Sequence, residues 1–261
     1  MREIFTMWRY TKMVVLTALT AAVYAALLIP LKSIPLIPGF TEIRVGTVIP
    51  VVFGILFGPA GAWGSALGNL IGDFFGTLSF GTVFGFIGNF FAALVSYKMW
   101  GQMIWISSHE QVTMKSVKEI GEFFLIVIIS AVTCALIISW GLELINLYPL
   151  KIIGPIIVLN NTIAPLIIGP FLLLLLYPRI VRWDLLWKEI MDERDISISR
   201  HPGIGILLIC LGAIGGMAVG LTASFGLLYI PYVLSRLSPS HLIVTAVSPF
   251  LMILLMGCLL A

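Results

Sequence analysis

Apolar and polar positions alternate along this chain on the scale of whole helices. Long apolar runs begin near residues 10, 45, 60, 81, 120, 156, 203 and 241, and short connections between them contain most of the charges. Several runs approach the roughly 20 residues that a membrane-spanning helix needs. The pattern therefore predicts an all-α integral membrane protein with about eight spans.

Composition supports this reading. Of the 261 residues, 60% are hydrophobic and 10% are charged, and the mean hydropathy is +1.10. Soluble domains contain about 25% charged residues. The length leaves no room for a separate soluble domain beside the spans, so we expect the activity to reside in the membrane.

Charge distribution predicts the topology. With the N-terminus inside, eleven of the fifteen Lys and Arg residues fall on the inner side, and four fall on the outer side. The positive-inside rule then makes this a multi-pass plasma-membrane protein with both termini in the cytoplasm. The net charge of +3 is small, so no nucleic-acid partner is expected. The basic N-terminus lacks a cleavage site after its apolar run, which indicates a retained first helix.

Glycines at four-residue spacing mark the third span. Gly64, Gly68, Gly72 and Gly76 would form one smooth groove on a helix, where another backbone can approach closely. Asn69 and Asp73 lie beside this groove in apolar surroundings, where an unpaired charge is costly. Asp73 is therefore either a functional residue or a structurally paired one.

The first span carries a second row of small residues, Ala18, Ala22 and Ala26. Such a row gives a smooth face for close helix contact. Residues 31–44 follow, and their prolines exclude a regular helix. This loop could fold back as a lid. Its Glu42 and Arg44 could bind a ligand or form only a loop ion pair.

Polar and aromatic side chains are expected to converge on the outer side. A pocket with apolar walls and a few placed polar groups suits a small organic ligand. Asn160 and Asn161 could instead cap the start of the sixth span. The candidate substrate-binding residues are Phe40, Glu42, Arg44, Asn69, Asp73, Asn89, Tyr148, Asn160 and Asn161.

Motifs for bond-making chemistry are missing. The sequence has no G-x-x-x-x-G-K-[ST], H-E-x-x-H, G-x-S-x-G or Cys-x-x-Cys pattern. The three cysteines lie in apolar runs at spacings unlike a metal site. We therefore expect no enzyme activity, no ATP hydrolysis by this chain, no cofactor and no metal.

Three parts are predicted along the chain. Residues 1–182 form the six-helix substrate-binding core, and residues 203–261 form two additional transmembrane helices. Between them, residues 183–202 form a cytoplasmic connector. Its WDLLWKEIMDERD segment is typical of an amphipathic surface helix.

The sequence resembles a known family over residues 11–182. TALTAAVYAAL, a proline-rich loop and then EIRVGTVIPVVFGILFGPAGAWGSALGNLIGDFFG are similar to the substrate-binding S components of energy-coupling factor (ECF) transporters. The resemblance implies a six-helix protein that captures a vitamin or related micronutrient from outside. Its partners would be a transmembrane coupling subunit and two cytoplasmic ATPases.

The resemblance also implies roles for particular segments. Ala18, Ala22 and Ala26 would dock on the coupling subunit, and residues 31–44 would cover the ligand. The two spans after Pro202 depart from the family pattern. The alternative function is a stand-alone proton- or ion-coupled secondary transporter in which Asp73 carries the ion.

Overall fold

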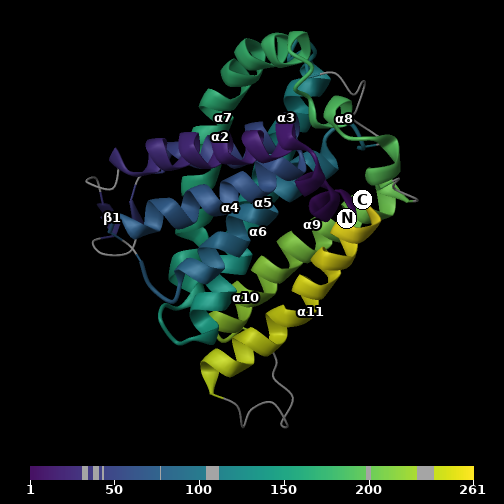
Figure 1. Ribbon diagram of the computed structural model, residues 1–261. Coiled ribbons are helices and arrows are strands. Elements are labelled where there is room, and N and C mark those ends of the chain that lie inside the picture. The colour runs from purple at the N-terminus through teal and green to yellow at the C-terminus, as the bar shows by residue number, and fades with distance from the viewer. Residues whose placement is uncertain are drawn as a thin grey trace.

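The protein is an all-α membrane protein built as a bundle of long helices (Figure 1). The computed structural model describes residues 1–30, 35–37, 41–42, 44–76, 78–103, 112–197, 201–227 and 238–261. Within these ranges, six helical segments are long and apolar enough to cross a membrane. Two short strands, β1 (Pro35–Ile37) and β2 (Thr41–Glu42), pair antiparallel in the loop after the first long helix. The predicted fold class is confirmed.

The elements follow the apolar runs of the sequence. The first part of the chain forms α1 (Glu3–Thr6), η1 (Met7–Arg9), α2 (Thr11–Leu28), η3 (Val45–Thr47), α3 (Val48–Phe57), α4 (Pro59–Phe74) and α5 (Thr82–Met99). The rest forms α6 (Val117–Leu144), α7 (Leu150–Arg182), α8 (Trp187–Ile190), η4 (Glu193–Asp195), α9 (Pro202–Cys210), η5 (Leu211–Gly215), α10 (Gly216–Ser224) and α11 (Pro239–Leu260). Helix α3 is too short to span a membrane alone, but all its residues are buried by the helices around it.

Helix α2 lies in the glycine groove of α4. A Cβ atom added at Gly64 or Gly68 would collide with residues of α2, and one added at Gly72 would make a tight contact with Leu28 of α2, because the two helices run in close contact. The close approach predicted from glycine spacing is therefore confirmed for these three positions. The prediction is wrong for Gly76, which follows the end of α4 with a φ of 140° and has no neighbour within 4 Å of an added Cβ.

Helix α2 has one face that is buried in the bundle and another that is exposed. Tyr24 and Ala21 are buried against α4, whereas Ala18, Ala22 and Ala26 are exposed. The alanine row is thus not used for packing within the described part of the bundle.

The last two spans form a C-terminal hairpin, which we define as residues 202–227 and 238–261. Its first arm is continuous from α9 through α10, with the π-helical turn η5 in the middle, and its second arm is α11. The hairpin packs against α5, α6 and α7, whereas α2 packs against α3 and α4. Figure 1 accordingly shows α2 and α11 on different sides of the bundle.

Both chain ends lie at one end of the bundle, which we call the terminal end (Figure 1). Here the Tyr10 hydroxyl donates to Asp195 over 2.7 Å, and the Lys98 ammonium lies 2.8 Å from a buried Glu3 carboxylate oxygen. The continuous amphipathic helix expected after residue 182 is not formed, because only the four-residue α8 and the short η4 occur there. Trp187 is instead buried against Gly58 and the Tyr97 ring, which fixes this segment to the bundle.

Candidate substrate-binding cavity

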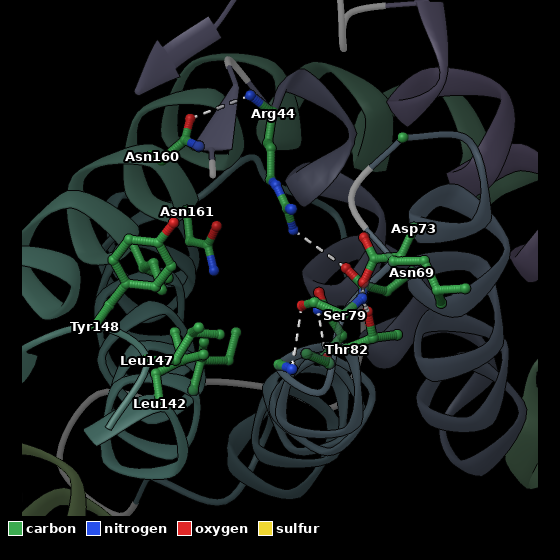
Figure 2. Close-up of a pocket in the computed structure, with 17 residues that line it drawn as sticks. Arg44, Asn69, Asp73, Ser79, Thr82, Leu142, Leu147, Tyr148, Asn160 and Asn161 are labelled. Carbon is green, nitrogen blue, oxygen red and sulfur yellow. Dashed lines mark hydrogen bonds between the residues drawn. The ribbon is translucent and has the colours of Figure 1, made fainter. Parts of the chain in front are cut away.

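A cavity of about 250 Å³ lies where α4 and α6 end and α5 and α7 begin (Figure 2). These helix ends lie away from the two chain ends (Figure 1). Short connections between antiparallel neighbours bring these helix ends together. The cavity is lined by Arg44, Asn69, Asp73, Gly76, Leu78, Ser79, Gly81, Thr82, Gly85, Asn89, Ile138, Leu142, Leu147, Tyr148, Ile157, Asn160 and Asn161.

One wall contains a guanidinium and a carboxylate joined through an amide. Arg44 Nη1 donates to Asn69 Oδ1 over 3.2 Å, and Asn69 Nδ2 donates to Asp73 Oδ2 over 3.1 Å. Both contacts require the same orientation of the Asn69 amide, since a guanidinium can only donate and a carboxylate accepts. Asn69 and Asp73 are buried. The negative charge at this wall is therefore balanced by a positive charge nearby.

Arg44 also connects two sides of the cavity. Its backbone N–H donates to Asn160 Oδ1 over 3.2 Å, so this residue reaches α7 through its main chain and α4 through its side chain. Thr47 stabilises this position by donating to the Arg44 carbonyl over 2.7 Å. Figure 2 shows the Arg44 side chain extending between Asn160 and the Asn69–Asp73 pair.

Two residues of the predicted site are described only in part or not at all. Phe40 falls outside the described residues. Glu42 belongs to β2 by its backbone, but its side chain lies outside the description. The roles expected for both residues therefore stay predictions.

Asn89 of α5 lies deeper in the cavity and is 3% exposed. Its Nδ2 donates to the Gly85 carbonyl over 2.8 Å, and its Oδ1 accepts a hydrogen bond of 2.8 Å from the Tyr24 hydroxyl. Both sides of the amide are thus held in place.

The opposite wall comes from the corner between α6 and α7, residues 142–150. This corner supplies Leu142, Leu147 and Tyr148 to the cavity. The Glu143 carboxylate accepts a 2.6 Å hydrogen bond from the backbone N–H of Leu150, which satisfies a free donor at the start of α7. The sequence analysis did not identify this stabilising role of Glu143.

Asn160 and Asn161 lie in the interior of α7. This helix begins at Leu150 with Pro149 at its N-cap, and it continues through four internal prolines. The alternative in which the asparagines cap the start of the helix is therefore wrong. Their side chains line the cavity instead.

Ser79 and Thr82 also line the cavity, although the sequence analysis did not select them. The Ser79 backbone N–H donates to Thr82 Oγ1, and the Gly81 N–H donates to Ser79 Oγ, each over 3.2 Å. A Ser and a Thr just before an apolar run are a helix-start signal that could have placed them at this helix end. Among the described residues, no group of three or more His, Cys, Asp or Glu side chains could hold a metal ion.

The structure is thus an all-α membrane bundle with a partly polar cavity at one end, and cavities between the helices of a bundle are a common place for small-molecule sites. The chain belongs to the QueT transporter family, whose model matches residues 14–178, more than half of the sequence. QueT proteins are S components of ECF transporters, so the resemblance inferred from the sequence is confirmed. Comparisons with curated proteins and with solved structures gave no match. The C-terminal hairpin lies outside the matched residues.

Proposed function

We propose that this protein is the substrate-capture subunit of an ECF importer and that it binds the base of a queuosine precursor from the outer side of the membrane. Family membership supports this choice of substrate, because QueT proteins are S components for queuosine precursors. The observation that carries the proposal is the cavity, with Arg44, Asn69 and Asp73 at one wall and Tyr148, Asn160 and Asn161 at the other.

Cavity size favours a compact ligand. Its volume of about 250 Å³ is below the roughly 300–1,000 Å³ that is typical of sites for drug-sized molecules. A fused two-ring base fits a cavity of this small volume better than a large vitamin does. We expect the apolar side chains of Ile138, Leu142 and Ile157 to contact the ring faces.

Cavity polarity favours a ligand without net charge. The described lining contains one guanidinium and one carboxylate, which balance each other. A 7-deazaguanine ring, the ring system of queuosine, presents neighbouring N–H donors and a carbonyl acceptor on one edge. The Asp73 carboxylate suits the N–H donors, and the amides of the opposite wall suit the carbonyl.

Energy would come from partner subunits. The sequence contains no phosphate-binding loop, and the exposed row of Ala18, Ala22 and Ala26 suits close contact with a coupling subunit. In this proposal the cavity end faces outward, the terminal end faces the cytoplasm, and two ATPases bind the coupling subunit.

Calorimetric titration of the purified protein tests the substrate. We expect saturable binding of 7-deazaguanine, weaker binding of a phosphorylated nucleoside of the same base, and no binding of riboflavin or folate. Guanine serves as the matched ring control. The proposal is refuted if 7-deazaguanine neither releases heat nor raises the melting temperature while another compound does.

A further inference from the structure

We infer that the C-terminal hairpin is a positioning element for the apolar wall of the cavity, acting through Met217 and Val247. The inference rests on the proposed function for its binding readout. It assigns a role to a part of the chain that lies outside the family match.

Among the described residues, the buried apolar side chains form two clusters, and the partly buried Val132 packs against both. The larger cluster fills the interior of the bundle and extends to the terminal end. The smaller cluster combines cavity-lining side chains with hairpin side chains, and its buried members are Ala92, Cys134, Ala135, Leu136, Ile138, Leu142, Leu150, Ile153, Ile157, Met217, Ala223, Ile243 and Val247. The cavity wall thus packs as one unit with the half of the hairpin that contains Met217, Ala223, Ile243 and Val247.

Contacts between the hairpin and the α6–α7 corner are close. A Cβ atom added at Gly220 would lie 2.9 Å from Leu150 Cδ1, and one added at Gly154 would lie 3.2 Å from Met217 Sδ. Leu150 is the residue whose backbone N–H is held by Glu143. The Leu150 side chain of the corner thus packs on Gly220 of the hairpin, and the Met217 side chain of the hairpin packs on Gly154, one turn further along α7.

A polar contact fixes the same region. The Trp140 indole N–H lies 3.3 Å from both the Val244 carbonyl oxygen and Ser248 Oγ of α11. The Trp140 ring also packs edge-on against Phe84, the neighbour of cavity-lining Gly85. Through Trp140, α11 is connected to both α6 and α5 beside the cavity.

Shielding from lipid does not explain these contacts. Lipid chains are as apolar as leucine side chains, so the corner could face the bilayer at little cost. What the hairpin adds is a fixed packing arrangement, because close-packed side chains transmit small shifts to their neighbours. A loosened hairpin should therefore loosen the cavity wall.

Two matched positions on α11 test this inference. Val247 and Leu254 lie two helical turns apart and are 0% and 1% exposed. Val247 belongs to the smaller cluster with the cavity wall, whereas Leu254 belongs to the larger cluster. Val247→Ala and Leu254→Ala would both create a cavity in the hairpin contact, and the second removes more atoms.

We expect Val247→Ala to accelerate dissociation of 7-deazaguanine roughly three- to tenfold, with a smaller change in association. Met217→Ala should act in the same direction. Leu254→Ala should leave dissociation unchanged even if its melting temperature falls further. Equal acceleration in the Val247 and Leu254 variants, or none in either, would overturn the inference.

Hydrogen exchange provides a readout that needs no ligand. Backbone amides of residues 142–150 should exchange faster in Val247→Ala than in wild type and should be unchanged in Leu254→Ala. Unchanged exchange at the corner in Val247→Ala overturns the inference. A wild-type protein that binds no 7-deazaguanine refutes the proposed substrate instead, and the exchange experiment still decides the role of the hairpin.

Discussion

The Tyr24 hydroxyl of α2 donates a 2.8 Å hydrogen bond to the amide oxygen of Asn89 on α5. The orientation of this amide is determined, because the Gly85 carbonyl can only accept and therefore faces Nδ2. Asn89 lines the cavity, whereas Tyr24 belongs to the helix that exposes the alanine row. The hydrogen bond therefore joins the proposed ligand site directly to the proposed docking helix.

Tyr24→Phe should weaken binding of 7-deazaguanine about three- to tenfold, because it removes the donor that holds Asn89 and leaves a buried acceptor unsatisfied. Calorimetric titration measures the change. Tyr97→Phe is the matched control, since Tyr97 is also buried and its hydroxyl donates to Glu3 at the terminal end. Equal losses of affinity in the two variants would assign the effect to general destabilisation.

Asp73→Asn should reduce ligand affinity at least about tenfold, since it replaces the charged acceptor of this cavity wall with a neutral amide. Asp184→Asn, which changes an exposed carboxylate elsewhere, should have no effect. The secondary-transporter alternative makes a different prediction. It requires uptake into liposomes driven by an ion gradient without ATPases, and loss of that uptake in Asp73→Asn.

Much of the cavity could be predicted from the sequence, because polar side chains in long apolar runs need partners or ligands. Asn69, Asp73 and Asn89 were found for this reason, and they line the cavity. The apolar wall could not be found in this way. Ile138 and Ile157 look like any other apolar residue of a membrane span, and only tertiary packing places them beside the cavity.

Local sequence patterns do not predict the secondary structure correctly where tertiary contacts override them. Proline inside a helix removes a backbone hydrogen bond and usually breaks or kinks the helix, yet α7 continues through Pro155, Pro165, Pro170 and Pro178. Neighbouring helices can satisfy the backbone groups that prolines free in a membrane bundle. The charged segment after residue 182 had the pattern of a surface helix, but burial of Trp187 against Gly58 gives it an irregular path.

The Glu3–Lys98 pair should make stability depend on pH at the terminal end. Burial alone would raise the pKa of Glu3, but the charge and hydrogen bond of Lys98, together with a hydrogen bond from Ser197 and the charge of the N-terminal ammonium, lower that pKa from 4.5 to about 2. The folded pKa lies below the unfolded one, so this contribution is present above pH 4.5 and is lost as the pH falls towards 2.

Glu3→Gln should therefore destabilise the protein at pH 7 by about 3–5 kcal/mol, the usual cost of breaking a buried pair. The difference in melting temperature between wild type and this variant should narrow between pH 4.5 and 2. Thermal unfolding in detergent at several pH values measures it. A difference that stays constant over this range would contradict the assigned pKa.

Ala22→Trp should abolish association with the coupling subunit while leaving ligand binding intact. Ala22 is exposed at the centre of the alanine row, so a large ring there would hold the backbone of a partner helix away. Tyr24 and Ala21 face α4 on the other side of α2, so the fold and the cavity should tolerate the change. Met256→Trp is the control, because Met256 is 54% exposed on the hairpin and lies outside the proposed interface. Co-purification with the coupling subunit should be lost for the first variant and retained for the second. If both variants still co-purify with the coupling subunit, that subunit does not bind this face of α2.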